Sequence, residues 1–330
     1  MTRVTIKTIA EAVGVTHGTV SRALRDDPRV RQETTKLVKQ KAAELGYRPS
    51  RVGRALKTRK TGTLAIVLSY ANDPFYSQVL QAVHDRLFPL EISLFVAATE
   101  HDPARQRVTA EILSERMVDG VFVCCLPGMT EPFLQLSKNL PVVTINCDPQ
   151  IYPYSVYHDD FKAMGDCLKM LTRKGHRKVG YLGAQNGGFA QRTRLDAFNK
   201  FCRELSLHPT VRTADDVKIE VGAEAMEQWL DKDELPSALV CFNDTMAIGA
   251  MNACRKKGLR IPEDISLVGF DDIEMAAYLN PGLTTYSQPR YEMGRIAAEM
   301  MLALQSGKTP EAPVCLSGRL IERETVAHTP

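Results

Sequence analysis

Two groups of polar side chains in this sequence have the types and spacing of binding residues. The first lies near the start of the chain, where hydroxyl, imidazole and guanidinium groups recur within ten residues. Such groups donate hydrogen bonds to the base edges and phosphate oxygens of DNA, so they predict a nucleic-acid contact. The group consists of Thr16, His17, Ser21, Arg22 and Arg25.

The second group lies at the ends of apolar runs in the second half of the chain. Asn243 and Asp244 follow SALVCF, Asp271 and Asp272 follow ISLVGF, and Arg194 comes after a glycine-containing loop. In open α/β sheets a ligand sits beyond the carboxyl ends of the strands. Carboxylate, amide and guanidinium groups can clamp vicinal hydroxyls, so these residues predict a small-molecule site.

Residues of this second group also have structural interpretations that the sequence leaves open. Asn243 is equally suited to cap the helix that follows it. Asp272 is equally suited to a turn. Arg194 has an alternative role in a salt bridge with Asp196 or a neighbouring acid.

The first group needs a helix that presents it to a groove. Gly14 interrupts a helical apolar pattern, and glycine suits a turn that leaves the right-handed helical region. Thr16 is placed to cap the helix that follows, whose first turn would then face DNA. An ordinary helical hairpin with a solvated face has the same pattern. The apolar positions are Ile6, Ile9, Ala10 and Val13 before Gly14, and Val20, Ala23 and Leu24 after it.

A third helix and a basic linker follow. Leu37, Val38, Ala42 and Leu45 are expected on the inner face of this helix, with Gly46 at its C-terminal cap. From residue 49 to residue 60, PSRVGRALKTRK has five basic residues and too few apolar ones for a core. We therefore expect a linker that is disordered when free, because a glycine inside a helix costs about 1 kcal/mol relative to alanine.

From residue 63 onward, buried strand-like runs alternate with helical stretches. The pattern is typical of parallel sheets joined by helical crossovers, and it predicts an α/β fold with two Rossmann-like lobes. Helices are expected to start near Phe75, Pro103 and Thr130. The strand-like runs are 63–69, 92–98, 120–125 and 141–146 in the first set, and 178–183, 237–243 and 265–270 in the second.

Several strings in this chain resemble bacterial repressors of the LacI/GalR family. They are T-I-K-x-I-A-x-x-x-G-V-T-x-x-T-V-S-R-x-L at the start, ELGYRP at 44–49, and NDTMAIGAM, PEDISLVGFDD and PGLTTYSQPRYEMG in the core. The resemblance implies a helix-turn-helix headpiece (1–48), a hinge helix (49–61) and a core like periplasmic sugar-binding proteins (62–330). It also implies that the chain crosses between lobes three times, so that lobe 1 comprises about 62–159 and 291–325, and lobe 2 about 160–290.

The resemblance assigns a DNA-binding surface to the headpiece and hinge. The family's hinge helix forms on operator DNA and inserts a leucine into the minor groove, a position that Leu56 matches. Three residues depart from the family pattern: Arg31 replaces a capping serine, Ser50 an asparagine and Gly53 an alanine. The implied DNA-binding residues are Thr5, Thr16, His17, Gly18, Thr19, Ser21, Arg22, Arg25, Arg29, Arg54, Leu56 and Lys57.

The effector site that the resemblance implies lies between the core lobes. Val217 stands where many relatives have an aromatic residue, which predicts a pocket without a stacking platform. Lys218 and Arg290 are basic and near the expected cleft, so an effector with a carboxylate or phosphate is favoured; side chains that point to solvent are the alternative. The expected effector-binding residues are Asn146, Arg194, Asn243, Asp271, Gln288, Phe75 and His158.

Charge and composition favour a soluble regulator over an enzyme or a secreted protein. Residues 1–60 hold fifteen Lys or Arg and five Asp or Glu, so this segment is +10 and the remainder −7 within a net charge of +3. A basic head favours a polyanion partner. The sequence has no GxGxxG after a strand, no P-loop and no metal-ligand spacing, so no cofactor, metal or catalytic residues are expected. The eight cysteines include no CxxC and are expected to be buried thiols.

These observations together predict a cytoplasmic, homodimeric transcriptional regulator, most simply a repressor of a pseudo-palindromic operator. Its effector would be a sugar or sugar acid. A co-repressor-dependent or dual regulator that senses a nucleoside or nucleobase is the main alternative. A sugar-binding protein or an enzyme on a Rossmann-like core is the weaker one. No membrane association is expected, since no apolar run is long enough to span a bilayer.

Overall fold

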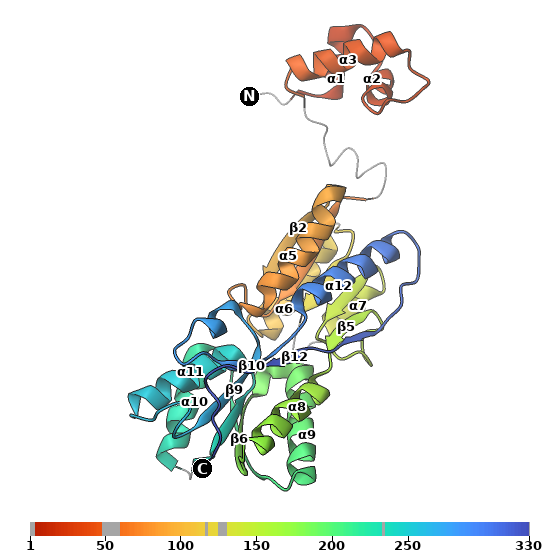
Figure 1. Cartoon of the computed structure of the whole chain (residues 1–330). Coiled ribbons are helices and arrows are strands. Elements are labelled where there is room, and N and C mark those ends of the chain that lie inside the picture. The colour runs from red at the N-terminus through yellow and green to blue at the C-terminus, as the bar shows by residue number, and fades with distance from the viewer. Residues whose placement is uncertain (1–3, 48–59, 116–117, 125–130, 233–234, 330) are drawn as a thin grey trace. The chain divides into compact units, whose positions relative to one another are not determined.

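The computed structural model describes residues 4–47, 60–115, 118–124, 131–232 and 235–329, and the chain divides into two compact units, 1–61 and 62–330. Most of the expected hinge, with Arg54, Leu56 and Lys57, lies outside the described residues. Each unit is described by itself (Figure 1).

The first unit is a bundle of three short helices, α1 (Ile6–Val13), α2 (His17–Ala23) and α3 (Gln32–Glu44). Gly14 ends α1 with φ of 73°, in the left-handed region where glycine has no side chain to clash. The Thr16 hydroxyl oxygen accepts the backbone N–H of Thr19 at 3.2 Å and caps α2. The predicted helix, turn and cap are therefore confirmed.

The core of this unit is small, with Ile9, Val20, Val38 and Ala42 at its centre. Leu37 was expected there, but its side chain is 51% exposed. Successive helical residues point about 100° apart, so the face fixed by Val38 and Ala42 excludes Leu37. Arg31 stands where the family has a capping serine, and α3 starts at Gln32 without a side-chain cap.

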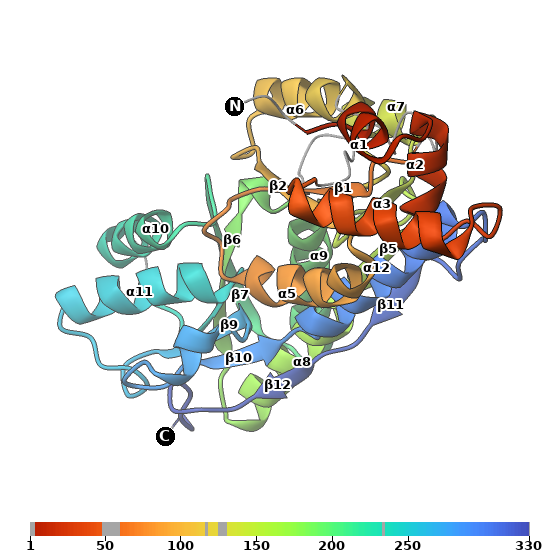
Figure 2. The same cartoon turned by 90° about the horizontal axis from the view of Figure 1, so that it is seen from above.

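The first lobe of the second unit is a parallel sheet between two helical layers. The strand order is β11-β5-β4-β3-β1-β2, with α5 and α12 packed on one face and α6 and α7 on the other (Figures 1 and 2). The strands are β1 (Thr63–Leu68), β2 (Ser93–Ala98), β3 (Val121–Cys124), β4 (Val142–Ile145), β5 (Ser155–His158) and β11 (Val314–Leu316). The helices are α5 (Phe75–Leu87), η1 (Phe88–Leu90), α6 (Pro103–Glu115), α7 (Glu131–Ser137) and α12 (Arg290–Gln305).

The second lobe repeats this arrangement, with strand order β12-β10-β9-β8-β6-β7 and α10 beside α11 on one face (Figure 2). The strands are β6 (Lys178–Ala184), β7 (His208–Ala214), β8 (Ala238–Cys241), β9 (Ser266–Asp271), β10 (Thr284–Ser287) and β12 (Arg319–Ile321). The helices are α8 (Asp160–Arg173), η2 (Gln185–Gly187), α9 (Gly188–Glu204), α10 (Ile219–Lys232), α11 (Asp244–Lys256) and η3 (Glu274–Ala277).

The chain passes between the lobes after β5, after β10 and after β11. Helix α12 packs on the first lobe, as expected. The segment assigned to that lobe, 291–325, was however predicted to extend too far along the chain. Strand β12 pairs antiparallel with β10 of the second sheet, and the backbone N–H of Thr325 donates to the carbonyl of Gly282 at 3.1 Å. The chain therefore re-enters the second lobe immediately after β11.

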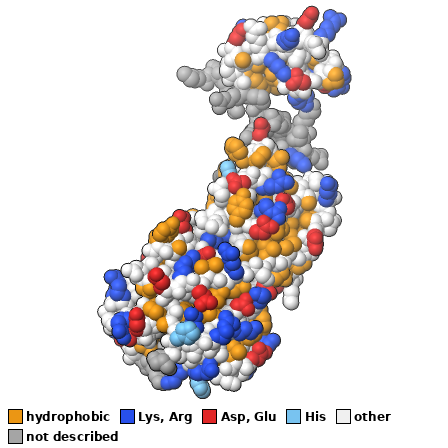
Figure 3. Space-filling model, viewed as in Figure 1, with side chains coloured by type: hydrophobic (Ala, Val, Ile, Leu, Met, Phe, Trp, Pro, Cys, Tyr) orange, Lys and Arg blue, Asp and Glu red, His pale blue; other side chains and the backbone are white. Residues whose placement is uncertain are grey.

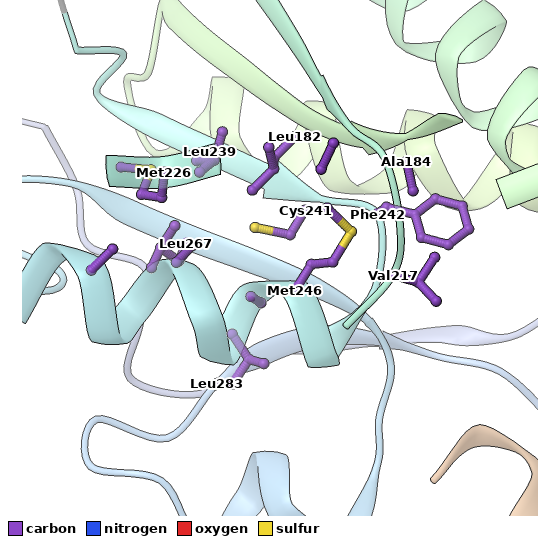
Figure 4. Close-up of a cluster of buried hydrophobic side chains, with 14 of the residues drawn as sticks. Leu182, Ala184, Val217, Met226, Leu239, Cys241, Phe242, Met246, Leu267 and Leu283 are labelled. Atoms are coloured by element: carbon purple, nitrogen blue, oxygen red, sulfur yellow. The ribbon is translucent and has the colours of Figure 1, made fainter. Parts of the chain in front are cut away.

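Apolar side chains fill the space between the second sheet and its helices. Leu239 and Leu267 of the sheet and Met246 of α11 belong to one buried cluster (Figure 4), which also includes the fully buried Trp229. Six of the seven described cysteines are buried, whereas Cys315 is exposed, contrary to expectation. Within the described residues, no helix is long and apolar enough to cross a membrane.

Candidate functional site

A cleft between the two lobes brings together six of the seven expected effector residues. Its walls come from the carboxyl ends of strands in both sheets, where the sheet rule places ligands. The cavity is about 60 Å³, which is room for a few water molecules, so a larger ligand requires the walls to move apart. The expected residues that line it are Phe75, Asn146, Arg194, Asn243, Asp271 and Gln288.

A chain of hydrogen bonds runs across the cleft floor from one lobe to the other. Asn146, after β4, donates through Nδ2 to Gln288 Oε1 at 3.1 Å, and Gln288 Nε2 donates to Asp271 Oδ1 at 2.6 Å. Asn146 and Asp271 have φ of 55° and 108°, conformations that non-glycine residues adopt at a cost. Such outliers cluster at ligand sites, where surrounding structure holds them.

Arg194 on α9 is buried in the cleft wall and already has protein partners. Its Nε and Nη2 lie 3.1 and 3.0 Å from Asp160 Oδ1, and Nη1 donates to the carbonyl of Phe242. The guanidinium lies 4.3 Å from the centroid of the Phe270 ring. Burial raises the pKa of Asp160, but the attraction of Arg194 and the hydrogen bond from His158 outweigh it, so that pKa is lowered. Arg194 thus forms the predicted alternative salt bridge, though with Asp160 and not Asp196, and also lines the cavity.

His158 does not line the cavity, contrary to the prediction. Its ring is buried at the end of β5, and Nδ1 lies 2.9 Å from Asp160 Oδ1. Because a carboxylate can only accept, His158 donates from Nδ1. The residue therefore supports Asp160 from behind the cleft wall.

The acidic and amide groups after β8 and β9 divide between structural and cleft-facing roles. Asn243 Oδ1 caps α11 by accepting the N–H of Met246 at 2.8 Å, and Asn243 also faces the cavity. Asp272 accepts from Arg323 at 2.7 Å and does not line the cavity. The capping alternative for Asn243 is therefore realised, and for Asp272 the structure removes the binding role.

Two carboxylates face the cavity in surroundings that oppose their charge. Burial raises the pKa of Asp271 well above its ordinary value, despite the opposing attraction of Arg194. Burial likewise raises the pKa of Asp73, which accepts the N–H of Phe75 at 2.9 Å. These groups favour ligands that donate hydrogen bonds.

Aromatic rings line the cleft, which corrects the expectation of a pocket without a stacking platform. Val217 does occupy part of the wall, but Phe75, Tyr76 and Phe242 surround the same cavity. Aromatic side chains in a cleft wall can pack against the apolar face of a sugar or against a base. The expectation was wrong because it considered one position of the wall and not the others.

The two basic residues that suggested an anionic effector are occupied elsewhere. Lys218 is 3.4 Å from Asp216 and lies over the Tyr70 ring, while Tyr70 donates to Asp216 at 2.5 Å across the mouth between the lobes. Arg290 is buried, not exposed, and donates to the carbonyl of Asp272 at 2.6 Å. Neither side chain lines the cavity. The solvent-facing alternative holds for Lys218, whose side chain is 49% exposed, but not for Arg290.

The first unit presents the expected DNA-binding residues on α2 and the loop after it. Arg22 on α2 and Arg25 in the turn after it each donate from Nε to a backbone carbonyl four residues earlier, at 3.2 and 2.9 Å. Arg29 instead forms a bidentate pair with Asp27, at 2.7 Å for Nη2, which orders the loop. His17 is exposed, and Thr5 caps α1. Their DNA contacts stay predictions.

The sequence did not identify Ser69, Asp73, His101 or Asp160 as part of the site. Ser69 directly follows β1, so the carboxyl-end rule applied to the first lobe would have found it. Asp160 precedes Arg194 by 34 residues, and no local pattern joins them.

Comparison with known proteins agrees with this architecture. Residues 5–50 match the family described as bacterial regulatory proteins, lacI family, and residues 168–326 match the periplasmic binding protein-like domain. The HTH-type transcriptional repressor PurR of Haemophilus influenzae (strain PittEE) is 32% identical over 302 residues, covering 90% of each chain. The HTH-type transcriptional regulator RegA of Clostridium saccharobutylicum is 31% identical over 328 residues, covering 97% of this chain and 98% of RegA.

Solved structures give the same result over nearly the whole chain. The lac repressor dimer bound to operator and the anti-inducer ONPF superposes with a TM-score of 0.90 at 26% identity, covering 99% of this chain and 100% of that one. Headpiece and two-lobed core therefore match together. The chain belongs to the lacI family of bacterial regulatory proteins and is a DNA-binding transcriptional regulator.

Proposed function

We propose that the chain is a dimeric repressor whose operator affinity is set by a neutral, hydroxyl-rich small molecule bound in the cleft. The observation that carries this is the convergence of Asn146, Gln288, Asp271 and Arg194 on one cavity between lobes that three chain crossings connect. Amide and carboxylate oxygens accept from hydroxyls, and amide and guanidinium nitrogens donate to them. Sugar hydroxyls satisfy both requirements.

The proposed signal is a change in the relation of the two lobes. Tyr70 to Asp216 at 2.5 Å and Arg192 to Asp148 at 3.0 Å are contacts between the lobes that an entering ligand has to break or rearrange. A ligand shifts the equilibrium only by its differential affinity for the two arrangements. Residues 49–61 lead directly into the first lobe, so movement of this lobe would alter the hinge and with it the affinity for operator DNA.

The experiment has two parts. Binding to the operator and to random DNA is measured by fluorescence anisotropy over a salt series, because specific contacts add to the salt-dependent phosphate contribution. Arg22→Ala should reduce the preference for operator by about 1 to 3 kcal/mol, the value of one bidentate base contact, whereas Lys57→Ala should weaken both DNAs alike. Equal loss on operator and random DNA for Arg22→Ala would contradict its assigned role.

The second part identifies the effector by its effect on melting temperature. Sugars, sugar acids, nucleosides and nucleobases are added singly to the full chain, and each active compound is then tested for its effect on operator affinity. Asp271→Asn keeps an acceptor for Gln288 but lowers the acceptor capacity of the cleft, so it should weaken the active compound at least tenfold. A compound that acts equally on this variant does not bind in the cleft.

A homodimer is the proposed assembly, and the support is an exposed apolar face on the first lobe. Strand β2 is at the sheet edge, with Phe95 and Val96 exposed by 55% and 52%, and Phe88 of η1 is 70% exposed. Figure 3 shows hydrophobic side chains at the surface of this lobe. Apolar groups exposed together mark association surfaces, and a second copy would cover the open edge.

Sedimentation velocity at micromolar concentration tests the assembly. The full chain should sediment as a dimer, and Phe95→Asp should shift it to monomer because a charge would be buried in the contact. Glu91→Asp, an exposed change of one methylene near the same strand, is the control and should leave the dimer intact. A monomeric parent chain would overturn the proposal.

Nucleobase or nucleoside sensing is the second candidate. Phe75, Tyr76 and Phe242 on the cleft wall favour it, because a flat base stacks on aromatic rings. The same melting series separates the two candidates: a response restricted to nucleosides or bases would replace the sugar proposal. In either case we expect the compound to be recovered chemically unchanged, as a cytoplasmic regulator on operator DNA requires binding and not turnover.

A further inference from the structure

We infer that Asp160 determines the charge class of the effector: by neutralising Arg194 inside the cleft wall, it makes the site reject anions. This inference rests on the proposed function, because it concerns the ligand of the same cleft. It excludes sugar acids, sugar phosphates and nucleotides as effectors. Neutral or amine-bearing compounds remain.

The geometry of the pair carries the first step. Asp160 Oδ1 is contacted by Arg194 Nε at 3.1 Å, Arg194 Nη2 at 3.0 Å and His158 Nδ1 at 2.9 Å. Asp160 and Arg194 have side chains only 2% and 3% exposed. An ion pair removed from water is screened little, so its two charges nearly cancel for a ligand that enters beside it.

A ligand anion would have to compete with this pair. Arg194 Nη1 is also engaged with the carbonyl of Phe242, and the ring of Phe270 covers one face of the guanidinium. What the guanidinium still offers a ligand is its remaining N–H donors and not an unpaired charge. A hydroxyl or carbonyl oxygen accepts from such donors without needing a counter-ion.

The other charged groups of the cleft reinforce the same preference. Asp73 and Asp271 line the cavity, and within the described part of the chain neither has a Lys, Arg or His nitrogen within 4.0 Å. Lys218 is held by Asp216. Among the described residues, the lining thus offers a carboxylate or phosphate no unpaired arginine or lysine, because its one arginine is already paired with Asp160.

Inorganic sulfate is a suitable probe, because it is small enough for the narrow cavity and needs no knowledge of the effector. The full chain is compared with Asp160→Asn, which keeps an acceptor oxygen but removes the charge. Melting temperature is followed from 0 to about 20 mM sulfate at constant ionic strength and pH 6.

For Asp160→Asn we expect a saturable rise of at least about 2 °C, since one bound ligand at tenfold its Kd produces a shift of this size. The parent chain and Asp160→Glu, which retains the charge, should show no saturable rise. The double variant Asp160→Asn with Arg194→Gln should lose the response, because the cation is gone. Identical responses of parent and Asp160→Asn, or a response that survives in the double variant, would overturn the inference.

The experiment also gives an answer when the Asp160→Asn variant fails to fold. If Asp160→Asn is unfolded in chloride but folds in sulfate, the anion has replaced the missing charge and the inference stands. If it stays unfolded in both, the inference is rejected. The sulfate response reports the charge balance beside Arg194, whereas loss of effector control over operator affinity reports the proposed function, so the two fail separately.

Discussion

Replacing Arg194 by alanine is expected to destabilise the second unit strongly, whatever ligand the cleft binds. The substitution leaves the carboxylate of Asp160 buried with His158 and without its cation. Removing one partner of a buried ion pair costs about 3 to 5 kcal/mol. Loss of the guanidinium contacts with Phe242 and Phe270 acts in the same direction.

Urea denaturation followed by fluorescence measures this loss. With an m-value of about 3 kcal/mol/M, the midpoint should fall by about 1 to 2 M. Arg192→Ala is the matched control two residues earlier on α9. Its partner is Asp148, but the Arg192 side chain is 61% exposed, and exposed pairs contribute about 0 to 1 kcal/mol.

The double variant Arg194→Ala with Asp160→Asn separates an unpaired charge from simple loss of packing. It should be more stable than Arg194→Ala alone, because the buried carboxylate is no longer charged. A loss below about 1 kcal/mol for Arg194→Ala would refute the ion-pair argument. So would a double variant whose loss equals the sum of the two single losses.

Three further outcomes follow from other parts of the structure. Gly18→Ala should stabilise the headpiece by about 0.5 to 1 kcal/mol, because the nearest atoms to a new Cβ are 3.8 Å away and alanine favours the helix. The same change should weaken operator binding, because Gly18 is expected to permit close approach to DNA. Thermal melting measures the first effect and fluorescence anisotropy the second. Burial raises the pKa of Asp244 to about 7, so the folded state binds this proton more tightly than the unfolded state does. The free energy of unfolding should therefore fall by up to about 4 kcal/mol as pH rises from about 4 to 7. In urea denaturation measured over this pH range, Asp244→Asn should remove the fall. Gly249→Ala should cost about 1 to 3 kcal/mol or more in the same assay, because its Cβ would overlap the carbonyl oxygen of Ile219 where α10 and α11 meet.

Local features of this chain were predictable wherever one short segment determines the outcome. Gly14 and Thr16 specify a turn and a cap by their own chemistry, and the apolar runs around Ile66 and Val268 form central strands because both of their faces are covered. Strand β7 was missed because an edge strand buries little: its pattern, HPTVRTA, is largely polar.

Non-local pairings were beyond reach of the same reasoning. The three-residue strand β12 has no composition that assigns it to one sheet or the other, and it joins the second only through its partner β10. Six of the expected effector residues line one cavity because side chains at strand ends converge by topology, and their contact with an effector stays a prediction. His158 lies outside this cavity because its ring pairs with Asp160 in the wall behind it.

The three crossings between lobes also determine when this protein can fold during synthesis. The apolar side of α5, with Val79 and Val83, is covered by α12, which leaves the ribosome about 200 residues later. At about 5 to 20 residues per second this interval is on the order of 10 to 40 s. Until then the first lobe lacks both this cover and its edge strand β11, although most of its sheet has been made. Nascent chains that stall before Arg290 should therefore expose an apolar surface and depend on chaperones. The headpiece is complete by residue 47 and can fold before the core has been synthesised.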